Sequence, residues 1–159
     1  MKNLFLSFAL VASFNAFAGN TAGITYSDID SVDGPGLTLS GVSGNFVYDL
    51  DVMSLSCSGC SSATVNATQG LYAYGDVSAG SVYLGFFSID SNLGDRVTEP
   101  TVGYVRRGSD ANFKIGYVGG DVDSLITELA WKVGSGNIEL NLLNDGYDVL
   151  TTLGYTWNF

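Results

Sequence analysis

The chain has 159 residues, of which 46% are hydrophobic and 14% charged, and its formal net charge is −10 at pH 7. This length is typical of one domain, and scarce charge with abundant aromatic residues indicates a folded chain. The sequence contains no histidine, which excludes Ser-His-Asp hydrolysis and histidine-ligated zinc. With 16 acidic against 6 basic residues, nucleic acid is disfavoured as a partner because phosphate binding needs positive charge.

Residues 1–18 have the pattern of a secretory signal peptide. A short basic start is followed by an apolar run over 4–14 and by the small-x-small cleavage pattern Ala16–Ala18. We therefore expect the mature domain to span 19–159 and to be exported. A buried N-terminal helix is the alternative, and the strand-like composition that begins at Gly19 disfavours it.

Cys57 and Cys60 are the two cysteines of the chain. An exported protein meets an oxidising compartment, so we expect either a local disulfide that clips a loop or two free thiols. A redox role would need a thioredoxin-like βαβ context that the sequence lacks. A zinc site would need two further ligands, so no metal and no cofactor is expected.

Ten segments with strand composition follow the signal peptide, and no apolar run beyond it is long enough for a transmembrane helix. They are 22–29, 36–42, 46–56, 64–75, 81–90, 98–107, 112–119, 125–134, 137–143 and 149–159. Short turns alternate with longer acidic connections, the latter at 30–35, 57–63, 90–97, 119–124 and 144–147. This rhythm is typical of transmembrane β-barrels. The sequence therefore predicts an all-β, closed antiparallel up-and-down barrel of ten strands, with eight strands as the alternative.

Polarity alternates along most of these segments, as expected when one strand face meets lipid and the other a lumen. From Leu125 to Val133 the odd positions are mainly apolar, whereas the even positions include Glu128 and Lys132. Segments 64–75 and 81–90 are ambiguous. Aromatic residues of the apolar faces lie beside short turns or at the chain end, which predicts an aromatic girdle at one membrane interface: Phe46, Tyr48, Tyr104, Phe113, Trp131, Trp157 and Phe159.

The chain ends with aromatic residues at alternate positions, Tyr155, Trp157 and Phe159. This ending resembles the C-terminal signature of bacterial outer-membrane barrels, and the mature chain is similar in pattern to small barrels of the OmpX/Ail, OmpW and OmpA-barrel types. The resemblance implies the outer membrane of a Gram-negative bacterium, with both termini in the periplasm. It also implies contact with lipid and lipopolysaccharide, and biogenesis by periplasmic chaperones and the barrel-assembly machinery that recognises the last strand.

Charged side chains fall on the inward faces of the predicted strands: Asp49, Asp51, Arg107, Lys114, Glu128, Lys132 and Glu139. Buried charge is unfavourable unless paired, so we expect ion pairs that fill the lumen. Lys132 and Glu139 are expected to pair across the turn at 134–136. A narrow polar channel is the alternative, although ten strands are closer to filled barrels than to open porins. A catalytic Asp49–Asp51 dyad is disfavoured, because such carboxylates more often simply share a lumen-facing strand face.

The longer connections carry an acidic cluster that we interpret as a solvated rim, with divalent cations shared with lipopolysaccharide as the alternative: Asp28, Asp30, Asp33, Asp90, Asp95, Glu99, Asp121, Asp123, Asp145 and Asp148. The enzymes among such barrels use histidine, which this chain lacks. The sequence therefore predicts a non-enzymatic barrel with an envelope-structural or narrow porin-like role. A soluble secreted β-sandwich that acts as a binding or adhesion module is the alternative.

Overall fold

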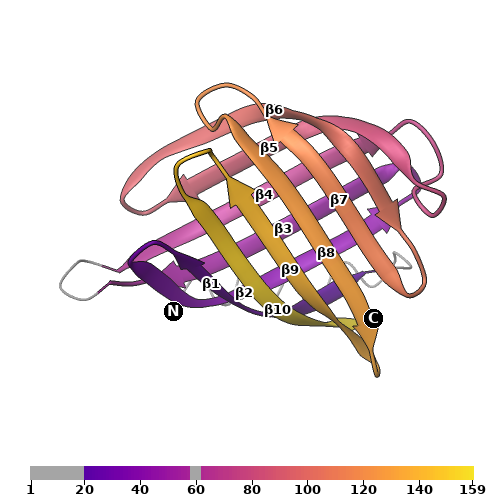
Figure 1. Ribbon diagram of the computed structural model, residues 1–159, viewed down its shortest axis with the longest axis horizontal. Helices are drawn as coiled ribbons and strands as arrows, with labels where there is room; N and C mark the ends of the chain where they lie inside the picture. The colour runs from indigo at the N-terminus through magenta and orange to yellow at the C-terminus, as the bar shows by residue number, and fades with distance from the viewer. Residues whose placement is uncertain (1–19, 58–61) are drawn as a thin grey trace.

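The computed structural model describes residues 20–57 and 62–159, so the predicted signal peptide lies outside the described residues. Ten antiparallel strands form a closed barrel in which sequence neighbours pair and the first strand pairs with the last (Figure 1). The strands are β1 (Thr21–Ile29), β2 (Val32–Ser43), β3 (Phe46–Leu55), β4 (Ala63–Ala73), β5 (Ser81–Ser91), β6 (Gly94–Arg107), β7 (Ala111–Val118), β8 (Ser124–Val133), β9 (Gly136–Asn144) and β10 (Val149–Asn158). The predicted ten-stranded barrel is confirmed, whereas the eight-stranded count and the β-sandwich are wrong. Among the described residues, no helix is long and apolar enough to span a membrane.

One end of the barrel holds both described chain ends, and we call it the terminal end. The backbone N–H of Phe159 donates to the carbonyl of Asn20 at 3.1 Å. Up-and-down pairing brings four connections to this end, those at 44–45, 74–80, 108–110 and 134–135. In the 74–80 connection, hydrogen bonds from the side chain and backbone of Ser78 hold the pKa of Asp76 below its usual value.

The other connections meet at the opposite end, and two of them are shorter than predicted. The connections expected over 30–35 and 90–97 are turns of residues 30–31 and 92–93. The first connection is shorter than predicted because Pro35, a residue type that usually indicates a turn, lies within β2 opposite Tyr26 of β1. Proline is tolerated within a strand at a position where the ladder needs no backbone N–H donor.

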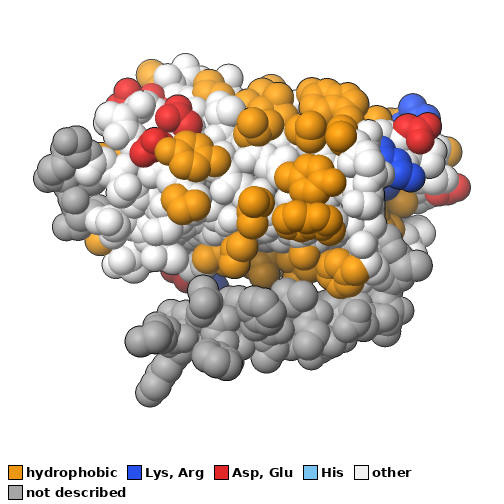
Figure 2. Space-filling model, turned by 90° about the horizontal axis from the view of Figure 1, so that it is seen from below, with side chains coloured by type: hydrophobic (Ala, Val, Ile, Leu, Met, Phe, Trp, Pro, Cys, Tyr) orange, Lys and Arg blue, Asp and Glu red, His pale blue; other side chains and the backbone are white. Residues whose placement is uncertain are grey.

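The outer wall of the barrel is apolar on every strand. Each strand contributes at least one exposed large hydrophobic side chain, for example Ile24, Leu37, Phe46, Tyr72, Leu84, Val102, Ile115, Leu125, Ile138 and Leu153. On the face drawn in Figure 2 these side chains form a band across the middle of the wall, and charged side chains lie toward the two ends. The structure also shows which face of the ambiguous segment 81–90 is inward. Tyr83 and Phe87 of β5 point inward and are buried, whereas Leu84 and Phe86 are exposed.

The inward side chains form two apolar clusters with polar residues between them. The cluster near the opposite end contains Met53, Leu55, Ala67, Phe87, Val118 and Ile126. The cluster near the terminal end contains Val47, Leu71, Ala73, Tyr83 and Val105. The inner wall therefore carries apolar side chains on both sides of its central polar residues.

Tyr83 fits into the barrel because two neighbouring strands carry glycine beside it. Its partner across the β5–β6 ladder is Gly103, and Gly103 in turn pairs with Gly116 of β7. A Cβ atom on Gly103 would lie 2.8 Å from the Tyr83 hydroxyl, and one on Gly116 would lie closer still. Both contacts are shorter than real Cβ atoms make, so this fully buried ring requires glycine at both positions.

Candidate functional site in the lumen

Four charged side chains form a closed ring of ion pairs in the middle of the lumen. Nζ of Lys114 lies 2.5 Å from Oδ2 of Asp49 and 2.8 Å from Oε2 of Glu128. Nη2 of Arg107 lies 3.1 Å from Oδ1 of Asp49, and Nη1 of Arg107 pairs with Oε1 of Glu128. Each cation therefore contacts both carboxylates, and the four formal charges cancel. The ring joins four of the seven residues predicted for the lumen.

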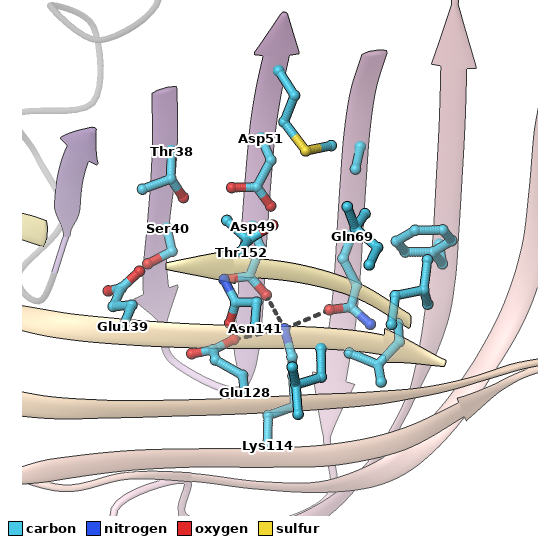
Figure 3. A pocket seen from close by; sticks show the side chains of 17 residues that line it. Thr38, Ser40, Asp49, Asp51, Gln69, Lys114, Glu128, Glu139, Asn141 and Thr152 are labelled. Carbon is cyan, nitrogen blue, oxygen red and sulfur yellow. Dashed lines mark hydrogen bonds and ion pairs between the residues drawn. The ribbon is translucent and has the colours of Figure 1, made fainter. Parts of the chain in front are cut away.

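Strand register and barrel closure together place these groups. Lys114 of β7 and Glu128 of β8 are direct partners in the ladder, whereas Asp49 comes from β3, which is not a neighbour of β6, β7 or β8. The contacts to Asp49 therefore cross the lumen, as the dashed lines of Figure 3 show for Lys114. Gln69 of β4 adds a third acceptor for Lys114, with Oε1 2.6 Å from Nζ.

The ring is almost completely removed from solvent. The side chains of Lys114 and Glu128 are 4% and 6% exposed, and those of Arg107 and Asp49 are 11% exposed. Charges buried in this way remain stable only when paired and hydrogen-bonded on several sides. The ion pairs that cross the lumen therefore link opposite walls of the barrel.

The other three predicted lumen residues lie outside the ring. Oε1 of Glu139 accepts a hydrogen bond from Thr156 at 2.8 Å, and Oδ1 of Asp51 has no hydrogen-bond partner among the described residues. The predicted Lys132–Glu139 pair is wrong. Register places Lys132 opposite Asn137 and Glu139 opposite Ala130, so Lys132 is exposed at the terminal end while Glu139 is buried.

Sequence reasoning missed Gln69 and Thr156 as partners of the charged residues. Thr156 lies on the inward parity of β10, opposite the apolar face that ends at Trp157, so strand alternation alone could have found it. Gln69 lies on a strand whose two faces were ambiguous, and its position on the inner wall follows only from the barrel itself.

A cavity of about 80 Å³ adjoins the ring on the side toward the opposite end. Asp51, Glu139 and Asn141 line it together with apolar side chains such as Met53 and Leu150 (Figure 3). Oδ1 of Asp51 and Oδ1 of Asn141 are buried without a hydrogen-bond partner in the described part of the chain. The size and polar lining of this cavity suit ordered water.

The site does not have the arrangement of a metal centre or of a carboxylate dyad. Within residues 20–57 and 62–159, no group of three or more Cys, Asp and Glu side chains is placed to hold a metal ion. Both carboxylate oxygens of Asp49 are engaged within the ring, Oδ1 by Arg107 and Oδ2 by Lys114. The ring is suited to closing and bracing the lumen.

Three acidic side chains of the opposite end accept hydrogen bonds from nearby donors. The hydroxyls of Tyr26 and Tyr117 donate to the carboxylates of Asp33 and Asp123. Backbone N–H groups of residues 147 and 148 donate to Asp145 and lower its pKa below the usual value. These contacts describe a hydrogen-bonded rim.

The predicted cysteine clip lies at the same end. Cys57 is disulfide-bonded, and Cys60 lies outside the described residues.

Comparison with known proteins finds solved structures that match the chain. No family model matches the chain, and no curated protein matches it. A structure of the KdgM porin in complex with disordered oligogalacturonate is similar to it with a TM-score of 0.46 and 12% sequence identity, covering 87% of this chain and 99% of that one. The function of this chain has to follow from its own residues.

Proposed function

We propose that the chain is an integral, non-enzymatic β-barrel of the Gram-negative outer membrane, with an envelope-structural role and a lumen closed by its own side chains. The observation that carries this proposal is the inverted arrangement of side chains. Large hydrophobic residues are exposed on every strand of the outer wall, while Asp49, Arg107, Lys114 and Glu128 are paired inside. Soluble monomers rarely expose such an extended apolar surface.

Barrel closure supports the same proposal through the backbone. In hydrocarbon every backbone N–H and C=O needs a partner within the protein, and a closed barrel provides one without leaving an edge strand. Pairing between β1 and β10 over Thr21 to Asp28 supplies this closure. Tilted strands cross a membrane with about 9–11 residues, and nine of the ten strands have at least 9 residues.

Aromatic side chains supply two belts at the expected depths. Tyr72, Tyr104, Trp131 and Trp157 are exposed toward the terminal end, and Tyr26 and Tyr117 are exposed toward the opposite end. Amphipathic rings of this kind favour the headgroup level of a bilayer. With both described chain ends on one side, the termini would face the periplasm, and Tyr155, Trp157 and Phe159 would present the assembly signal to the barrel-assembly machinery there.

The side chains inside the lumen support a closed lumen over an open pore. The ion-pair ring crosses the middle of the lumen, and the cluster around Met53 and Phe87 occupies much of the region between the ring and the opposite end, beside the 80 Å³ cavity. Barrels of about eight strands are just filled by side chains, and ten strands leave room for little more. A narrow pore is the second candidate, favoured by the 80 Å³ cavity beside the ring.

Fractionation and electrophoresis test the location, and conductance separates the two candidates. We expect the folded chain to require detergent for extraction and to migrate differently on a gel before and after boiling. In planar bilayers we expect it to produce no steady conductance steps. Steady steps would replace the closed barrel by the narrow pore, whereas release into buffer without detergent would contradict the membrane proposal itself.

A further inference from the structure

A second and larger cavity opens at the terminal end of the barrel. Its volume is about 570 Å³, which is within the range of small-molecule sites. It adjoins the 80 Å³ cavity at Ser40, which lines both, but Arg107 lines only the larger cavity, whereas Asp49, Lys114 and Glu128 line only the smaller one. We call the larger cavity the vestibule.

The charges that line the vestibule are both positive. They belong to Arg107, whose side chain is 11% exposed, and to Lys132, which is exposed and forms no ion pair within the described chain. None of the described residues that line it carries a carboxylate. The positive lining contrasts with the charge of the whole chain, which holds 16 acidic and only 6 basic residues. A concave surface lined by one sign of charge raises the local concentration of the opposite ion.

Hydrogen-bond donors surround these two cations. Asn112, Asn137 and Asn158 contribute side-chain amides to the lining, and Ser109 contributes a hydroxyl. Among the described residues, the amide of Asn137 donates in two long contacts of 3.3 and 3.4 Å, to Thr156 and Asn158. Nε of Arg107 is buried and has no hydrogen-bond partner in the described structure. Charged and amide donors around an opening suit the oxygens of an anion.

The acidic groups nearest the vestibule do not line it. Asp49 and Glu128 bind the Nη atoms of Arg107 from the inner side of the ring, and they line the smaller cavity. Asp76 and Asp110 lie in exposed connections of this end, and neither is among the described residues that line the vestibule. Asp49 and Glu128 thus balance the charge of Arg107 within the ring, and Lys132 is the lining cation that forms no ion pair among the described residues.

We infer that the vestibule is a binding site for a small soluble oxyanion with two or more carboxylate or phosphate oxygens, held by Lys132 at the opening and Arg107 at the base. Amide donors from residues 112, 137 and 158 would orient the anion between them. This binding site is not part of the proposed function. The inference rests on that function only in naming the periplasm as the compartment that supplies the ligand. The ligand does not pass the ring.

The test uses the full folded chain in zwitterionic detergent, titrated with citrate and separately with inorganic phosphate. Calorimetry gives the affinity, and the side-chain amide signals of Asn112 and Asn137 in NMR spectra locate the bound anion. Lys132→Gln removes the exposed cation of the site, so we expect it to weaken citrate binding about tenfold, the loss of one charge-assisted contact. Arg106→Gln is the matched control: it removes one positive charge from the same end, but Arg106 is exposed and is not among the lining residues.

The outcomes distinguish a defined binding site from non-specific electrostatic attraction to the terminal end. Saturable binding that shifts the two amide signals, and that Lys132→Gln weakens far more than Arg106→Gln, supports the site. Equal weakening by the two variants would show general attraction to the basic end and would overturn the inference. So would the absence of saturable binding by either anion. Because gel migration before and after boiling reports folding separately, neither result depends on whether the barrel resides in the outer membrane.

Discussion

Nζ of Lys114 lies 2.5 Å from Oδ2 of Asp49, although the two residues are 65 positions apart in the chain and come from strands that are not neighbours. This contact spans the lumen and completes a ring with Arg107 and Glu128. The two walls of the barrel are thus joined by side chains as well as by the backbone ladder.

Lys114→Met is expected to destabilise the barrel strongly. The variant keeps an unbranched side chain that is one heavy atom shorter, but leaves Asp49 and Glu128 buried with Arg107 as their one shared cation among the described residues. Removing one partner of a buried ion pair typically costs about 3–5 kcal/mol. Reversible urea unfolding in lipid vesicles measures the change in the free energy of unfolding.

Lys132→Met is the control for that measurement. Lys132 is exposed at the terminal end and forms no ion pair within the described residues. A surface substitution of this kind is expected to change the free energy of unfolding by less than about 0.5 kcal/mol. If the two lysine variants proved equally stable, the ring would not brace the barrel.

Gly116→Ala is expected to destabilise the barrel by overpacking. The added methyl group would collide with the hydroxyl of Tyr83 and would lie 2.9 Å from its ring carbon Cζ. Overpacking of a filled interior costs about 1–3 kcal/mol. The same unfolding measurement gives the loss, and adding Tyr83→Phe should recover part of it, since the hydroxyl is the closer obstacle.

Gly119→Ala is the control for overpacking, because a Cβ atom there would meet Pro100 at an ordinary 3.7 Å. It should leave stability nearly unchanged. A loss at Gly119 as large as at Gly116 would mean that glycine is needed for general flexibility near the end of β7, and not for the Tyr83 ring.

The two tryptophans should report a single membrane interface. Trp131 and Trp157 are 45% and 46% exposed on the outer wall, both near the terminal end. Lipids brominated near the headgroup should therefore quench their fluorescence more than lipids brominated near the chain ends. Stronger quenching from the bilayer centre would contradict the girdle, and no quenching by either lipid would contradict insertion.

Strand alternation predicted most of the fold because lipid and lumen select opposite polarity on strands such as β8, where Glu128 and Ala130 lie inside while Leu125 and Trp131 lie outside. Alternation was uninformative on β4 and β5. There the inward residues Leu71 and Tyr83 belong to an apolar cluster of the lumen, so both faces are apolar.

The charged groups of the site were predictable, but their partners were not. Inward parity identified Asp49 and Lys114, whereas their contact depends on which residues reach across the closed barrel. Even within the hairpin of Lys132 and Glu139, adjacency in sequence was misleading. Register gave those residues other partners, and burial differs sharply between the opening of the barrel and its interior.

The central claim, that the apolar outer wall faces hydrocarbon, is tested most directly by spin labels on the chain in lipid vesicles. Labels would replace Leu84 of β5 and Leu153 of β10, which are 50% and 56% exposed, with Tyr147, 95% exposed in a connection, as the water-facing reference. We expect oxygen to relax the labels at 84 and 153 more than a water-soluble nickel chelate does, with the reverse at 147. Labels at 84 and 153 that the chelate relaxes as strongly as the label at 147 would contradict it.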